Sequence, residues 1–153
     1  IYEIVGDTLN PVGDTQFGLS ALYSNSKLLL TFTENTAYTS SALNTDGVST
    51  PLPILALKEK CVFDTFSSDF VWCAAPLATS LAVGEWYKGT ITSVDNLWLL
   101  NTQSGEAKLY ADFADLSGRT IDVSDISINS TGTALSFTNK LDHTLWLYDL
   151  TAE

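Results

Sequence analysis

The sequence predicts an all-β fold made of about three copies of a four-stranded antiparallel unit. Short segments of alternating apolar and polar residues, separated by polar turns, run along the chain. Two parts of this pattern also repeat. Ala21–Thr33 aligns without a gap with Ile126–Thr138, and Asn96–Glu106 shares with Thr144–Glu153 a Leu-Trp-Leu strand that runs into a polar turn. The first repeat reads as a hairpin, and the second as the third strand of the unit with its outgoing turn.

The expected strands fall into three units, at residues 17–58, 61–112 and 123–150. The first unit has strands near Gly18–Tyr23, Leu28–Glu34, Ala37–Asn44 and Leu52–Leu57. The second has strands near Cys61–Thr65, Phe70–Ala75, Asn96–Asn101 and Ala107–Ala111. The third has strands near Asp125–Asn129, Ala134–Thr138 and Thr144–Asp149. In the first unit, Asp46-Gly47 is the clearest turn signal of the chain.

The third unit is one strand short, and the N-terminal segment 1–7 supplies the candidate. Its alternating residues are Ile1, Tyr2, Glu3, Ile4 and Val5. When the end of the chain is written directly onto its beginning, the joined sequence reproduces Leu97–Asp112 with almost no slippage. We therefore expect Ile1–Val5 to act as a closing, or assembly, strand for the last unit.

Two segments give the sequence its family likeness. Ser130-Thr-Gly-Thr-Ala-Leu135 has the place of a hairpin turn, and Leu145-Trp-Leu-Tyr-Asp149 has the place of a third strand. In these features the chain resembles the β-propeller superfamily, in particular WD40-like repeat proteins. The resemblance is one of architecture, since no Gly-His pair opens a repeat and neither Trp-Leu dipeptide is Trp-Asp. It implies four-stranded blades around a ring, with an N-terminal strand that completes the last blade.

Three blades do not close a ring, because propellers have typically four to eight. An open set leaves an unpaired strand edge and uncovered blade faces, which favour association. We therefore expect two chains to join head to tail into a six-bladed ring, each lending Ile1–Val5 to the last blade of the other. The alternative is that residues 1–153, a half-propeller, are a fragment of a larger single-chain propeller.

Composition narrows the classes of partner. The chain has 153 residues, is 45% hydrophobic and carries a formal charge of −11, so we expect one folded domain whose acidic field repels nucleic acid and anionic membranes. No apolar run approaches the roughly 20 residues of a membrane span, so we expect no membrane contact by this segment. The expected partners are a second copy of the chain and a protein or glycan ligand.

The two cysteines, Cys61 and Cys73, flank an expected turn at Thr65–Asp69, and counting outward from Ser67 places them opposite each other. This geometry suits a disulfide, with two buried thiols as the alternative. A disulfide and the sequon at Asn129 both favour an extracellular or periplasmic protein. The chain has no methionine and begins at Ile1, so we expect that a preceding segment was removed, for example by release from an anchored protein.

The sequence gives little support for a catalytic site or a metal site. The single histidine, His143, lies beside Asp142 after a turn, where a solvated loop residue is the simpler explanation. Cys61, Cys73 and His143 lack the spacing of zinc ligands, so we expect no metal and no cofactor. An acidic cluster between the second and third units suits a solvated connection, with carboxylates of a glycosidase as the alternative. Its members are Asp112, Asp115, Asp122 and Asp125.

The longest connection inside a unit, residues 76–94, carries the main hypothesis for a ligand site. Long insertions in repeat proteins collect on one binding face. Glu85, Trp86, Tyr87 and Lys88 lie between glycines and offer two aromatic rings with charges of both signs, which suits a sugar or a peptide. The alternative is that Trp86 folds back over its unit or packs against the neighbouring chain. The expected function is a non-catalytic binding and assembly module, with a carbohydrate-binding propeller and a glycosidase-like fragment as alternatives.

Overall fold

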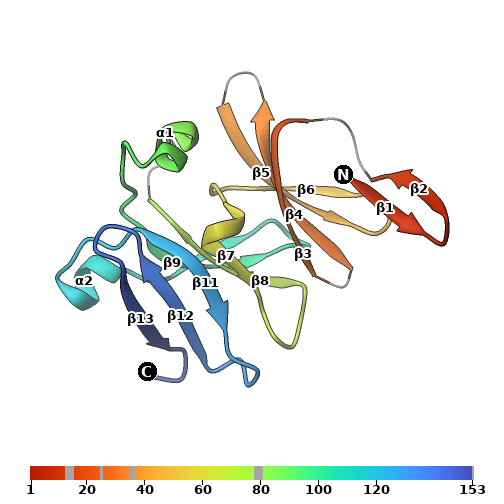
Figure 1. Ribbon diagram of the computed structural model, residues 1–153. Coiled ribbons are helices and arrows are strands. Elements are labelled where there is room, and N and C mark those ends of the chain that lie inside the picture. The colour runs from red at the N-terminus through yellow and green to blue at the C-terminus, as the bar shows by residue number, and fades with distance from the viewer. Residues whose placement is uncertain (13–15, 25, 35–36, 78–80, 153) are drawn as a thin grey trace.

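A computed structural model describes residues 1–12, 16–24, 26–34, 37–77 and 81–152. In these ranges the protein is all-β, with three larger antiparallel sheets, one two-stranded hairpin and three short helical segments (Figure 1). The prediction of four-stranded antiparallel sheets is confirmed. The described part of a single chain does not close into a ring (Figure 1). No helix in the described ranges is long and apolar enough to cross a membrane.

The first sheet has the strand order β3-β4-β5-β6. Its strands are β3 (Phe17–Ser24), β4 (Lys27–Glu34), β5 (Ala37–Asn44) and β6 (Ser49–Leu52). The Asp46-Gly47 turn joins β5 to β6 as expected, with Gly47 at φ 79°. The last strand ends earlier than the expected Leu52–Leu57 because Pro53 has no N–H to donate to the ladder. The chain instead bends and passes Leu55 and Leu57 into the interior.

The second sheet has the order β7-β8-β9-β10. Its strands are β7 (Cys61–Phe63), β8 (Phe70–Ala75), β9 (Asn96–Asn101) and β10 (Ala107–Ala111). It lies between the other two sheets and is buried on both faces, which explains the continuous apolar run of β8. Val71 and Cys73 pack toward the first sheet, whereas Trp72 and Ala74 pack toward the third.

The third sheet has three strands in the order β11-β12-β13. They are β11 (Val123–Ile128), β12 (Ala134–Asn139) and β13 (Thr144–Asp149). Leu135 and Phe137 alternate inward along β12 and pack against the second sheet. In the described residues no strand pairs with the other edge of β13. The third sheet therefore has three strands in the described residues, one fewer than each of the other two.

Short helices fill the connections between strands. The 3₁₀ helix η1 (Lys58–Lys60) joins the first two sheets, α1 (Val83–Lys88) lies in the long insertion, and α2 (Phe113–Ser117) precedes the third sheet. The Asp112 carboxylate caps α2 by accepting from the backbone N–H groups of Ala114 and Asp115. The acidic connection is thus partly helical.

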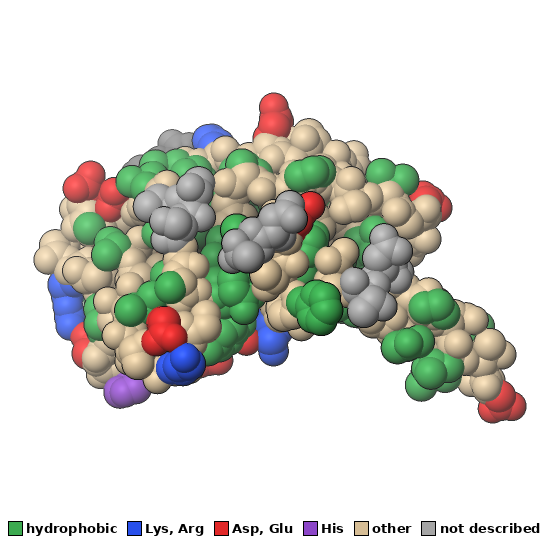
Figure 2. Space-filling view, turned by 90° about the horizontal axis from the view of Figure 1, so that it is seen from above, with side chains coloured by type: hydrophobic (Ala, Val, Ile, Leu, Met, Phe, Trp, Pro, Cys, Tyr) green, Lys and Arg blue, Asp and Glu red, His purple; other side chains and the backbone are tan. Residues whose placement is uncertain are grey.

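The N-terminal segment forms a hairpin that the sequence analysis missed. β1 (Tyr2–Val5) pairs with β2 (Thr8–Pro11) through a Gly6-Asp7 turn. The expected closing strand therefore already has one partner within its own chain, and its other edge is unpaired in the described residues. Figure 2 shows the hairpin standing away from the three packed sheets, with apolar side chains on its surface.

Candidate binding and assembly surfaces

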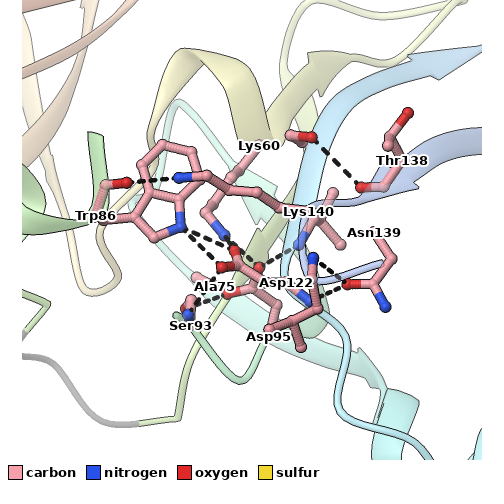
Figure 3. Close-up of polar contacts among 12 residues, drawn as sticks. Lys60, Ala75, Trp86, Ser93, Asp95, Asp122, Thr138, Asn139 and Lys140 are labelled. Carbon is pink, nitrogen blue, oxygen red and sulfur yellow. Dashed lines mark hydrogen bonds and ion pairs between the residues drawn. The ribbon is translucent and has the colours of Figure 1, made fainter. Parts of the chain in front are cut away.

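The long insertion folds back onto the sheets and buries its tryptophan. Trp86 is only 3% exposed, and its Nε1 donates to both carboxylate oxygens of Asp122, at 2.8 and 3.1 Å (Figure 3). The Trp86 ring is therefore not available to stack on a ligand. Trp86 instead folds inward, as in the alternative expectation. Its ring packs on the buried side chains of Leu57 and Val83.

The other residues of the expected ligand site have different surroundings. The side chains of Glu85 and Lys88 form an exposed ion pair at 2.7 Å on α1. Tyr87 is about half exposed, and its hydroxyl donates to Glu59 Oε2 at 2.9 Å. Tyr87 thus turns toward the first sheet and away from the Glu85–Lys88 pair, while its ring makes an edge contact with the buried Trp86 ring at a centroid distance of 5.2 Å.

Beneath Trp86 lies a buried ionic cluster of one lysine and two aspartates. Lys60 Nζ donates to Asp122 Oδ1 at 2.7 Å and to Asp95 Oδ2, and all three side chains are at most 1% exposed (Figure 3). Lys60 comes from η1, Asp95 precedes β9 and Asp122 precedes β11. The cluster therefore joins the chain segments that begin strands of the second and third sheets.

The remaining hydrogen-bonding capacity of the cluster is filled by its neighbours. The Ser93 N–H donates to Asp122, and the Val123 N–H donates to Asp95 at 2.7 Å. Burial raises the pKa of the Asp95 carboxyl, and Lys60 opposes that shift. Two carboxylates saturated by internal donors, with no exposed face, have no open position for a substrate. We assign the cluster a structural role.

A second lysine, Lys140, contacts both the ring and the backbone of Trp86. Lys140 Nζ lies 3.6 Å from the Trp86 ring centroid and donates to the Trp86 carbonyl oxygen (Figure 3). Lys60 Nζ lies 4.5 Å from the same ring centroid. The Trp86 ring is therefore a cation–π partner of two lysines, which fixes α1 over the cluster.

The acidic residues do not converge on one site. Asp112 caps α2, Asp115 lies in the first turn of that helix, and Asp122 belongs to the buried cluster. Asp125 is in β11 with φ 53°, and His143 has φ 58° in the turn before β13. No group of three or more His, Cys, Asp or Glu side chains among the described residues is arranged to hold a metal ion.

The cysteines lie at opposite positions of the hairpin formed by β7 and β8. Cys61 pairs with Cys73 in the strand register, their Cα atoms are 4.2 Å apart, and the structure joins them by a disulfide. Both residues are buried in the core between the first and second sheets. The bond therefore fastens the edge strand β7 to its neighbour β8.

Among the strands at sheet edges in the described residues, β13 and β1 carry exposed apolar side chains. On β13, Leu145 and Leu147 are 79% and 75% exposed and point away from the second sheet. On the N-terminal hairpin, Ile4 lies opposite Leu9 and Tyr2 lies opposite Pro11, so these four side chains share one face. Ile4 is 74% exposed. Both strands thus combine free backbone groups with uncovered apolar side chains.

A groove of about 750 Å³ separates the N-terminal hairpin from the first sheet. Ile1, Tyr2 and Pro11 line the side of the hairpin, and Leu28 and Leu43 line the side of the sheet. The hollow beside the projecting hairpin is visible in Figure 2. Polar and charged residues, among them Lys27 and Asp46, also line it, so its walls are mixed in character.

Comparison of the chain with protein-family models, curated proteins and solved structures finds no match. The function therefore rests on the surfaces of this chain. Sequence reasoning missed Lys60 and Asp95, which lie far apart along the chain and carry no motif. The local sequence Leu57-Lys-Glu-Lys-Cys61 is a charged run typical of an exposed connection, so it gave no signal that Lys60 is buried.

Proposed function

We propose that the chain is a non-catalytic binding and assembly module, and that two copies join head to tail to complete a six-bladed β-propeller. The observation that carries the proposal is that β13 and β1, two of the edge strands in the described residues, each have exposed apolar side chains beside an unpaired edge. In the assembly, β1 of one copy adds to β13 of the other by β-augmentation. The β1–β2 hairpin then lies on the last sheet of the partner.

A second copy is the proposed occupant of the groove beside the N-terminal hairpin, with the outward face of its third sheet in contact. The outward face of the third sheet carries short side chains, with Ser127 Oγ 2.7 Å from Ser136 Oγ, and is flanked by Leu145 and Leu147. We infer that this polar face with its leucine border packs in the groove, whose wall on the side of the first sheet combines Leu28 with Lys27 and Asp46. When the third sheet of each copy lies in the groove of the other, its outward face is covered. The edges of β1 and β13 are then paired in both copies.

The buried disulfide supports an oxidising location for this assembly. Bonds of this kind persist in secreted and periplasmic proteins and are rare in the cytosol. We therefore place the module in an extracellular or periplasmic setting. There, a preformed ring of loops offers a surface for protein or glycan ligands.

Charge substitutions test the exchange. The proposed ring has two equivalent interfaces, and either Ile4→Lys or Leu147→Glu places an unpaired charge in both of them. Each variant alone should therefore be a monomer by sedimentation velocity. An equimolar mixture should recover dimers, because one of its two interfaces is unmodified and the other pairs Lys with Glu. Lys88→Ala, on exposed α1, is the control and should behave like the unmodified chain. Dimers of either single variant, or no recovery on mixing, would reject the exchange.

A further inference from the structure

A second cavity lies at the junction of the first two sheets, at the end of β3–β5 opposite the groove. Its volume is about 350 Å³. The groove is bordered by the turn at Asn44–Gly47, whereas this cavity is bordered by Gly18 at the start of β3 and by Tyr38 at the start of β5. The two hollows are therefore separate, and self-association through the hairpin leaves this cavity open.

Two tyrosines form the aromatic part of the cavity lining. Tyr38 packs against the cluster of Leu57 and Val83, and Tyr87 reaches the cavity from α1. Gly18 is required for this arrangement, because a Cβ there would lie 3.3 Å from Tyr38 Cε1 and the backbone has φ +63°. The glycine thus makes room for the Tyr38 ring at the cavity wall.

Polar groups of both kinds complete the lining. Glu59 Oε2 accepts from the Tyr87 hydroxyl at 2.9 Å, and Lys58 Nζ lies 3.4 Å from Glu59 Oε1. The Ser20 hydroxyl lies beside the Tyr87 oxygen. Burial and the neighbouring Glu59 carboxylate raise the pKa of Tyr87, so its hydroxyl remains protonated and donates at neutral pH.

We propose that this cavity binds one unit of a neutral saccharide. Tyrosine rings cover the apolar faces of a sugar ring, while hydroxyl, carboxylate and ammonium groups match its alternating donors and acceptors. The opposite charges of Lys58 and Glu59 offset each other, so neither a strongly cationic nor a strongly anionic ligand is favoured. A volume at the lower end of the range for ligand pockets suits a single sugar residue.

This inference transfers the carbohydrate hypothesis from Trp86, which is buried, to Tyr38 and Tyr87. Only Tyr87 is common to the two sets of residues. Glu85 and Lys88 pair with each other on exposed α1 and do not border the cavity. The two versions of the site therefore make different predictions for variants of α1.

Saturation-transfer NMR of the full chain tests the proposal. The probes are the methyl glycosides of glucose, galactose, mannose and N-acetylglucosamine, with arginine amide as a cationic probe. We expect transfer to at least one glycoside and none to arginine amide. Tyr87→Ala and Glu59→Gln should weaken glycoside binding at least about fivefold, because they remove the ring face and the charged acceptor. Lys88→Ala should bind as the unmodified chain does.

Three results would overturn the proposal: no transfer to any of the four glycosides, binding unchanged in both cavity variants, or a preference for arginine amide. Glu59→Gln preserves size and lies on the surface of η1, so it guards against loss of binding by misfolding. Light scattering on the same samples reports the assembly state independently. A dimer that binds no glycoside rejects the saccharide site alone, and a monomer that binds one rejects the assembly alone.

Discussion

Lys60 Nζ lies 2.7 Å from Asp122 Oδ1, and neither side chain is more than 1% exposed. These two residues are 62 positions apart in the chain and come from the connections that precede the second and third sheets. Asp122 also accepts from Trp86 Nε1 at 2.8 Å. The Asp122 carboxylate thus links η1, the insertion that carries Trp86, and the start of the third sheet.

Removal of this carboxylate should strongly destabilise the fold. Asp122→Ala leaves Lys60 with Asp95 alone and leaves Trp86 Nε1 without its acceptor. Loss of one partner of a buried ion pair costs about 3–5 kcal/mol. Urea unfolding, followed by tryptophan fluorescence, should show a free energy of unfolding lower by about that amount.

The exposed pair of Arg119 with Asp142 is the matched control. Both side chains are in contact with water, so their interaction is screened and contributes little. Asp142 also accepts from the Thr144 N–H and hydroxyl, so Asp142→Ala should lower the free energy of unfolding slightly, by far less than Asp122→Ala does. Equal losses for Asp122→Ala and Asp142→Ala would contradict the structural role of the buried cluster.

Two glycines with similar backbone angles should differ in their tolerance of a side chain. Gly105 has φ 76°, and a Cβ there would lie 2.7 Å from the Pro51 carbonyl oxygen of the first sheet. Gly118 has φ 66° and no atom within 4 Å of the equivalent point. Both alanine variants carry a conformational cost of about 1–2 kcal/mol, and Gly105→Ala adds a clash of about 1–3 kcal/mol.

Thermal unfolding should therefore give a clearly lower Tm for Gly105→Ala than for Gly118→Ala. The turn at Gly105 belongs to the second sheet, and Pro51 belongs to the first. The comparison thus measures how closely these two sheets pack. Equal Tm values would show that the sheets are further apart than the structure has them.

Acid should weaken the junction between the first two sheets through Asp69. A hydrogen bond from Lys27 lowers the pKa of the Asp69 carboxyl, and Lys27 also donates to Thr102 Oγ1 at 2.8 Å. A lowered folded-state pKa gives stability that is present above the unfolded pKa and is lost as the pH falls through the folded one. The contribution should therefore be lost as the pH falls below about 4, the ordinary pKa of an aspartate.

Urea unfolding at a series of pH values checks this dependence. Asp69→Asn should flatten the decline of stability in that acidic range, since it removes the titrating group. Lys27→Gln should flatten it as well, and the double variant should add nothing further to the flattening. An undiminished decline in Asp69→Asn would show that other carboxyls account for the acid sensitivity.

The disulfide should contribute measurably to stability because it closes a loop with a sequence separation of 12. The Cys61→Ala/Cys73→Ala variant should lose about 3 kcal/mol in urea unfolding, the amount expected for a loop of that size. Protein prepared under oxidising conditions and unfolded without reductant should take up no iodoacetamide by mass spectrometry. Uptake at both cysteines would contradict the bond.

The sequence predicted most strands because alternation and turn residues act locally. The Asp46-Gly47 turn and the Leu-Trp-Leu segments each fix a strand with its neighbours in the chain. The bounds of β6 differ from expectation because Pro53 ends the ladder. Helix α2 was also predictable, since Asp112 and Gly118 are its N-terminal and C-terminal caps.

The parts that were missed depend on contacts over long sequence distances. The interior place of Trp86 follows from Asp122, 36 residues later, and no local pattern links the two. The cavity between Tyr38 and Tyr87 likewise requires knowledge of how α1 lies against the first sheet. The N-terminal hairpin was local and predictable from its Gly6-Asp7 turn. The alternation within Ile1–Val5 by itself predicts a single strand and does not identify its partner.

The molar mass of the unmodified chain in solution tests the central claim most directly. Size-exclusion chromatography with multi-angle light scattering, over a range of micromolar concentrations, measures it without reference to shape. The account predicts a dimer of about twice the 16.6 kDa chain mass, because in the proposed ring β1 of each copy pairs with β13 of the other. A monomer of 16.6 kDa at every concentration would contradict it.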